Sequence, residues 1–163
     1  MASELTPQMK VSDLLDNNPA LLGVFTRMGF CFGYGDATVE DICKAAGIDP
    51  NGFLIICRVY SQEGFRPSAD DLKDVDLSVI VKYLSLSHDY YLNVAIKDLA
   101  AGIGRMIVPC GDNMQRAIWN FFTEFKEELQ KHFSYEESFI FPNVGNLDAG
   151  LPTEDHSGVE EAL

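Results

Sequence analysis

The feature that most constrains this chain is a long helical repeat of mostly apolar side chains near its C-terminal end. Seven residues follow one another at steps of four, three, four, three, four and three: Ile118, Phe122, Phe125, Leu129, His132, Glu136 and Phe139. Alternating steps of three and four keep side chains on one face of an α-helix. The repeat therefore predicts a long helix with one buried stripe. It also places His132 and Glu136 inside that stripe rather than on the solvent face.

A second helical stripe precedes the first, over residues 77–107. Its members are Ile80, Leu84, His88, Tyr91, Ala95 and Leu99, and His88 lies in its middle. The segment "VPCGDN" breaks the pattern between the two helices. After the second helix, "PNVGNLDAGLPTE" predicts a loop. A third helix is expected to begin near Glu154 and to carry His156 on its inward face.

Several short helices are expected before the two long ones. Pro19 and Gly29 bound one of them, and Thr38 and Gly47 are a good N-cap and a natural stop for the next. Residues 49–62 read as a further helix, although the run "FLIICRVY" is rich enough in β-formers to leave a strand open. The sequence thus predicts an all-α chain. Its parts are a small helical domain over 1–66, a linker over 67–76 and a helical bundle over 77–163.

Charge and composition exclude several classes of function. The chain has 12 Lys and Arg against 25 Asp and Glu, a formal net charge of −13. Such a charge repels phosphate backbones and anionic lipids, so neither nucleic acid nor membrane is an expected partner. The sequence shows no signal peptide and no apolar run of about 20 residues, which predicts a cytoplasmic protein. The four scattered cysteines are then expected to be reduced thiols.

The three histidines of the sequence, His88, His132 and His156, each fall on the expected inward face of a different helix. Glu136 follows His132 by four residues, and Glu160 follows His156 by the same step, so each pair shares one side of a helix. Imidazole nitrogens with carboxylate oxygens suit iron, manganese or zinc, and helical bundles assemble such ligands from facing helices.

Each candidate ligand also has a simpler interpretation. A single inward histidine such as His88 is often a hydrogen-bonded core residue. His132 and Glu136 would also fit a buried ion pair, and His156 with Glu160 would fit the first turn of a solvated helix. The agreement of all three histidines in facing one core favours a metal site.

Three segments carry a resemblance to a known family. "SHDYYLNVAI", "KHFSYEESFIFPNV" and "EDHSGVEEAL" resemble the hemerythrin-like cation-binding bundle, in which histidines and HxxxE pairs from four helices hold two irons. The preceding "LLGVFTRMGFCFGYGDATVEDICKAAGID" looks like the small N-terminal domain of the repair-of-iron-centres (YtfE/ScdA-type) proteins. Together the two similarities cover most of the chain.

The resemblance implies a ligand set and a function. His88, His132 and His156 match terminal iron ligands, and Glu136 matches a carboxylate that bridges the irons. The implied activity is the repair of iron–sulfur clusters damaged by nitric oxide or peroxide, with iron–sulfur proteins as partners. No catalytic side chain is implied. Related domains instead sense dioxygen, nitric oxide or redox state, and a metal-free dimerising module is a further alternative.

The sequence departs from the family pattern in two places. The family typically has adjacent cysteines at the turn where this chain has Cys31 followed by Phe32. The fourth helix of the bundle and most of the third are also missing from the sequence. The expected fold is therefore the small domain followed by an incomplete up-down hemerythrin-like four-helix bundle. Either the chain is a fragment of a longer protein, or self-association in a homodimer supplies the missing helices.

Overall fold

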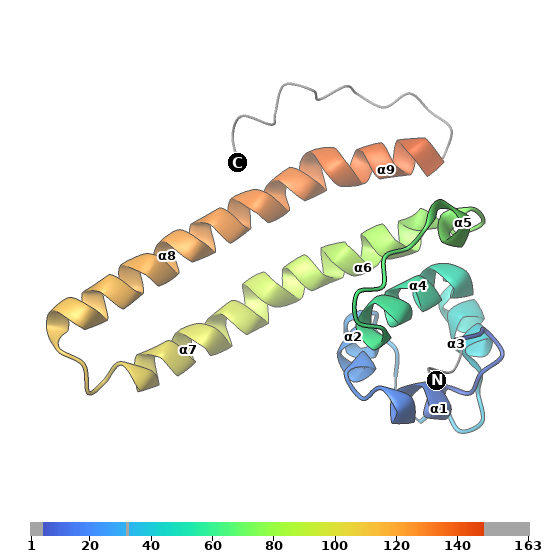
Figure 1. Ribbon diagram of the computed structural model, residues 1–163, viewed down its shortest axis with the longest axis horizontal. Coiled ribbons are helices and arrows are strands. Elements are labelled where there is room, and N and C mark those ends of the chain that lie inside the picture. Colours follow the sequence, from blue (N-terminus) through green and yellow to red (C-terminus); the bar gives the residue numbers. More distant parts are fainter. Residues whose placement is uncertain (1–4, 32, 149–163) are drawn as a thin grey trace. The chain divides into compact units, whose positions relative to one another are not determined.

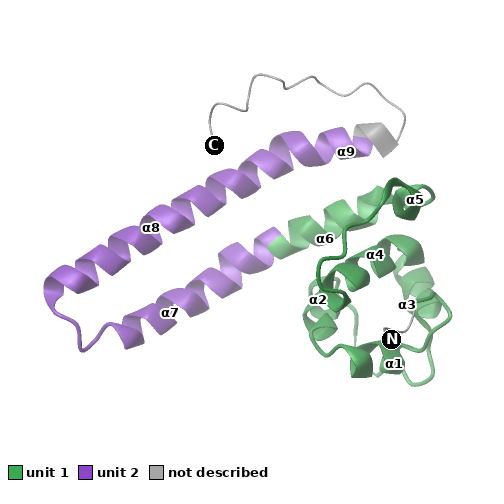
Figure 2. Ribbon diagram, in the orientation of Figure 1, with its two compact units in different colours: residues 1–87 green, residues 88–163 purple. Residues whose placement is uncertain are grey.

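A computed structural model describes residues 5–31 and 33–148 of the chain. Over these residues the protein is all-helical, as the sequence predicts, and its one β-type pairing is an isolated bridge between Lys10 and Thr38. The chain divides into two compact units, residues 1–87 and residues 88–163 (Figure 2). The boundary falls inside a long helix, Leu77–Tyr90, whose last turn belongs to the second unit.

The first unit is a cluster of short helices (Figure 1). They are α1 (Val11–Asn17), α2 (Leu21–Arg27), α3 (Val39–Ala46), α4 (Pro50–Ser61), α5 (Ala69–Leu72) and the beginning of α6 (Leu77–Tyr90). The predicted signals act as expected around α3. Thr38 forms a capping box with Asp41, and Gly47 ends the helix at φ +64°, a conformation that glycine adopts without strain.

The segment for which the sequence also allowed a strand forms the helix α4. Asp49 favours the helix, because its carboxylate accepts hydrogen bonds from the backbone N–H groups of Asn51 and Gly52. Pro50 occupies the first turn, where its missing N–H costs nothing. The β-branched and aromatic residues of α4 are mostly buried, so tertiary packing overrides their local preference.

The core of the first unit is built around Phe25. Its ring lies 5.4 Å from that of Phe30, 5.8 Å from that of Tyr34 and 5.3 Å from that of Phe53, measured between centroids. Tilted and edge-on arrangements of this kind suit the quadrupoles of aromatic rings. Among the described residues, the largest fully buried side chains all belong to this unit: Phe25, Phe53, Leu14, Leu21, Val11, Val24, Val39, Cys43 and Cys57.

The second unit is a helical hairpin (Figures 1 and 2). Its first arm continues α6 through η1 (Tyr91–Ala95), a π-helical segment, into α7 (Ile96–Met106). Its second arm runs through α8 (Asp112–Tyr135), the π-helical η2 (Glu136–Ile140) and α9 (Phe141–Asp148). The sequence correctly predicts both long helices and the break between them. None of the described helices is long and apolar enough to cross a membrane.

Two predicted non-helical segments contain helix. The second arm continues to Asp148, whereas a loop was expected from Pro142 onwards. Pro142 is the second residue of α9, directly after the π-helical segment, and the helix continues through it. The expected linker over 67–76 holds the single-turn helix α5, whose N-terminus Ser68 caps together with Asp71. The loop expected over 149–154 lies outside the described residues.

The predicted stripe on the second arm is only partly buried. Phe122 is buried, but Phe125 and Phe139 are 41% and 45% exposed, and the side chain of His132 is 51% exposed. The expectation that His132 occupies a core position is therefore wrong for the described structure. The reason is geometric: the facing arm covers one edge of the stripe and leaves the other edge open. Phe133, next to His132, is buried in its place.

Candidate metal centre

The two arms of the hairpin bring together three of the four residues that the sequence singles out. His88 comes from the last turn of α6, His132 from α8, and Glu136 is the first residue of η2. The carboxylate of Glu136 lies between the two imidazoles. Its Oε2 is 3.1 Å from His88 Nε2, and its Oε1 is 3.3 Å from His132 Nε2. The fourth predicted ligand, His156, lies outside the described residues.

His88 is the best-enclosed member of the group. Its side chain is 9% exposed and lies between two aromatic rings. The imidazole stacks on Phe133 at 3.9 Å between centroids, with 12° between the ring planes, and faces Phe141 at 5.5 Å and 15°. These contacts hold the plane of the imidazole. Since the nitrogen lone pair and the N–H bond lie in that plane, the packing also decides which groups the ring nitrogens can reach.

Glu136 is half-buried, with 29% of its side chain exposed. A carboxylate in such a position needs hydrogen bonds or opposite charge, because a lone buried charge is costly. Each of its oxygens faces one imidazole nitrogen. The arrangement can therefore act in two ways: as a His–carboxylate–His hydrogen-bonded group, or as a bridging carboxylate between two ions that are each held by one histidine.

The distances fit the second arrangement as well as the first. Two ligand atoms at right angles around a metal, with bonds of roughly 2.1 Å, are about 3.0 Å apart. The separations from Glu136 to His88 and to His132 lie close to that value. The donor set, two imidazole nitrogens and one carboxylate, also suits iron, manganese or zinc. The three side chains thus have the donor atoms and the spacing that metal ligands would need.

The ligand set is nevertheless small. Within the described part of the chain, no three or more His, Cys, Asp or Glu side chains surround a single point as metal ligands would. Each of the two candidate positions has one nitrogen and one oxygen from the described residues. Most protein metal sites use at least three protein ligands, so each position would need further ligands to form a site of the usual kind.

Both arms of the hairpin contain a π-helical segment close to these residues. The segment η1 begins three residues after His88, and η2 begins at Glu136 itself. Short π-helical segments inside α-helices occur frequently at functional sites.

The segment η2 also explains a core position that the sequence did not predict. Its wider turn buries Phe141, five residues after Glu136, where the regular repeat predicts Phe139.

Glu137 is a site residue that the sequence analysis missed. Its Oε1 lies 2.9 Å from His88 Nδ1, on the side of the ring opposite to Glu136. The regular repeat assigns Glu137 to the solvent side of the helix, and its side chain is indeed 43% exposed. The sequence feature that could have identified Glu137 is its position directly after Glu136. Two neighbouring carboxylates can approach the two nitrogens of one imidazole.

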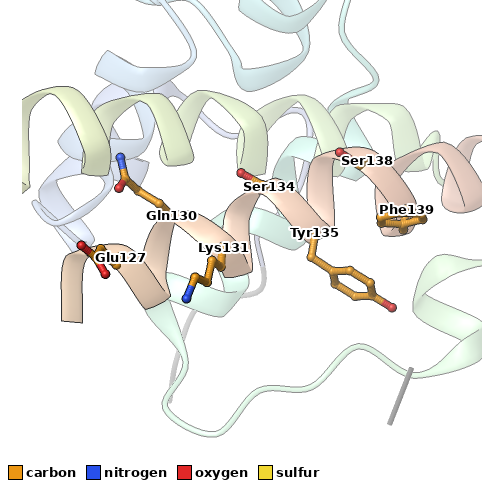
Figure 3. A pocket seen from close by; sticks show the side chains of 7 residues that line it. All are labelled: Glu127, Gln130, Lys131, Ser134, Tyr135, Ser138 and Phe139. Atoms are coloured by element: carbon orange, nitrogen blue, oxygen red, sulfur yellow. The ribbon is translucent and has the colours of Figure 1, made fainter. Parts of the chain in front are cut away.

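A separate hollow runs along the second arm (Figure 3). It is lined by Glu127, Gln130, Lys131, Ser134, Tyr135, Ser138 and Phe139. All of these residues belong to α8 and η2, so a single helical rod forms the walls and the hollow is widely open. It contains none of the candidate metal ligands. The His88–Glu136–His132 group is therefore the candidate site considered below.

The four cysteines differ in burial. Cys31 is exposed, Cys110 is half-buried, and Cys43 and Cys57 are buried in the core of the first unit. Burial raises the pKa of Cys43 to about 12, with a smaller contribution from the charge of Asp49, and burial likewise raises the pKa of Cys57. Thiolates are the metal-binding and nucleophilic form, so neither buried thiol is suited to either role at neutral pH.

Comparisons with protein-family models, curated proteins and solved structures found no match to this chain.

Proposed function

We propose that this chain is a non-haem di-iron protein of the hemerythrin-like type, acting in the cytoplasm in the response to nitrosative and oxidative stress. The observation that carries the proposal is the carboxylate of Glu136 between the Nε2 atoms of His88 and His132. In this proposal the first unit is the small ScdA-like domain and the hairpin is the first half of the bundle. The order and spacing of the histidine motifs support that assignment.

The proposed ligands are the three side chains that the hairpin brings together and, from the sequence alone, His156. His88 and His132 would each hold one iron through Nε2, Glu136 would bridge the two, and His156 would add a further imidazole. When bound, iron supplies a redox-active centre with coordination positions open to dioxygen or nitric oxide. The protein residues fix the geometry and control access to it.

The two histidines differ in their access to solvent. His88 lies between Phe133 and Phe141, which exclude water from its ring. His132 is half exposed, so its side of the group is open to small molecules or to a partner protein. One firmly enclosed position beside an open one suits a protein that must keep its metal pair and still exchange ligands or iron. We infer from this asymmetry that repair of damaged iron–sulfur clusters is the function of the chain.

The test is a repair assay. A [4Fe–4S] enzyme is inactivated with nitric oxide and then incubated, without air, with the iron-loaded chain or with its His132→Ala variant. Repair predicts that the wild-type chain restores activity and that the variant does not. A sensor of dioxygen, nitric oxide or redox state predicts instead reversible gas binding with no recovery of the enzyme. Recovery that is equal for both proteins would contradict the role of His132.

One observation favours a second candidate, a metal-free module that dimerises with another copy of this chain. Several large apolar side chains of the hairpin are exposed: Tyr91, Val94, Leu99, Met106, Met114, Phe121, Phe125 and Phe139. Two hairpins packed through a two-fold axis would bury these side chains against each other. Sedimentation with and without a chelator separates the candidates, since a dimer of this kind survives removal of metal.

A further inference from the structure

The two nitrogens of His88 face two different carboxylates. Nε2 lies 3.1 Å from Glu136 Oε2, and Nδ1 lies 2.9 Å from Glu137 Oε1. We propose that Glu137 is a positioning residue for the site: its carboxylate accepts the Nδ1–H of His88 and so leaves the Nε2 lone pair free for a metal ion. The metal part of this inference rests on the proposed function, whereas the effect on the proton of His88 does not.

In a neutral imidazole, only one of the two ring nitrogens can carry the proton. A neutral ring carries one N–H, and the hydrogen-bond acceptor beside it decides which nitrogen holds the proton. A nitrogen that binds a metal cannot also hold a proton, so a metal on Nε2 requires the proton on Nδ1. Glu137 is the group placed to accept that proton in a hydrogen bond. A carboxylate in this place also makes the imidazole a stronger donor to the metal.

The surroundings of His88 make the acceptor important. With Phe133 and Phe141 against its faces, the buried ring has little access to water, and a buried N–H without an acceptor is costly. His132 does not need an equivalent partner, since half of its side chain is exposed and water can serve its second nitrogen. The chain therefore places the additional carboxylate on the enclosed histidine.

Helix geometry explains how adjacent residues reach one ring. Successive residues on a helix point about 100° apart, so the side chains of Glu136 and Glu137 diverge as they extend toward the facing arm. The imidazole of His88 lies between their carboxylates, with one ring nitrogen facing each of them. Both glutamates lie at the start of η2, where the helix widens. A single substitution at Glu137 therefore removes one carboxylate and leaves the proposed ligand Glu136 in place.

The experiment uses the full chain and three variants. Glu137→Ala removes the acceptor, Glu137→Gln keeps an acceptor oxygen without the charge, and Glu128→Gln is the control at an exposed position of the same arm. In the metal-free proteins, ¹⁵N NMR of the histidine rings reports which nitrogen of His88 carries the proton. Anaerobic titration with Fe(II) then gives the affinity of each protein.

We expect the proton on Nδ1 in the wild type, in Glu128→Gln and in Glu137→Gln, and a shift toward Nε2 in Glu137→Ala. We also expect the affinity for Fe(II) to fall about 10- to 100-fold in Glu137→Ala and less in Glu137→Gln. An unchanged proton position and affinity in Glu137→Ala would overturn the inference and leave the iron function intact. A proton that moves as expected in proteins that bind no iron would overturn the iron function and leave the positioning role of Glu137 intact.

Discussion

The ring of Phe133 lies flat against the imidazole of His88, with 3.9 Å between the centroids and 12° between the planes. The contact joins the two arms of the hairpin and comes from the residue directly after a candidate ligand, His132. Since it holds the plane of the imidazole, it also holds the direction in which the two ring nitrogens point. The packing of Phe133 therefore helps to set the geometry of the candidate site.

Replacing Phe133 with leucine tests this contact. Leucine keeps the helix and an apolar side chain but loses the flat face, so we expect a loss of about 1 kcal/mol in the free energy of unfolding and weaker iron binding. Phe121→Leu is the matched control, because Phe121 lies on the same helix and is 70% exposed. Urea unfolding and iron titration measure both effects. Equal losses in the two variants would contradict the special role of Phe133.

The N-cap of α4 gives a prediction for the first unit. Asp49 accepts hydrogen bonds from the N–H groups of Asn51 and Gly52, and Oδ2 also accepts one from the N–H of Asp76 at 3.2 Å. Asp49→Ala should lower the free energy of unfolding by about 1–2 kcal/mol. Asp36→Ala removes an exposed ion pair with Lys10 and should lower the free energy of unfolding less than Asp49→Ala does. Thermal and urea unfolding compare them, and the reverse order would refute this account of the cap.

The cysteines should fall into two classes of reactivity. With a pKa of about 12, Cys43 has only about one thiolate in ten thousand molecules at pH 8, and Cys57 is likewise disfavoured by burial. A thiol reagent should therefore label Cys31 and Cys110 in the native protein, and all four cysteines only after unfolding. Mass spectrometry of the labelled peptides measures the pattern. Fast native labelling of Cys43 would show that the core of the first unit opens readily.

Tyr60 should make the protein less stable in alkali. Burial is the main cause that raises its pKa to about 12, and its contact with Tyr83 adds to the shift. The folded state thus favours the neutral phenol. Its contribution to stability is fully present below the unfolded pKa of about 10, and it is lost as the pH rises toward 12. Urea unfolding between these pH values should show that the free energy of unfolding falls less steeply with pH in Tyr60→Phe than in the wild type. The same fall in both proteins would mean that other groups cause the loss of stability.

Much of the fold follows from local rules that the sequence displays. Thr38, Gly47 and Asp49 act at helix ends as their chemistry predicts, and the three-and-four spacing identifies both long helices. The continuation through Pro142 is different. It depends on a π-helical segment, and a regular repeat carries no sign of an extra residue in a turn.

The candidate site also has features that the sequence predicts and features that it does not. Spacing alone places His132 beside Glu136, and the stripe on the first arm places His88 opposite to them, as the structure has it. The exposure of His132 and the contact from Glu137 to His88 could not be predicted from spacing. They depend on how far one arm covers the other and on the direction of two neighbouring side chains.

The central claim is that His88, His132 and Glu136 hold iron, and metal content tests it most directly. The chain, its His132→Ala variant and the control Glu128→Gln are expressed with iron and purified without air, and iron is measured by elemental analysis and near-ultraviolet absorption. The account predicts roughly stoichiometric iron in the wild type and the control, and its loss in His132→Ala. Iron in none of the three proteins, or the same iron in all of them, would contradict it.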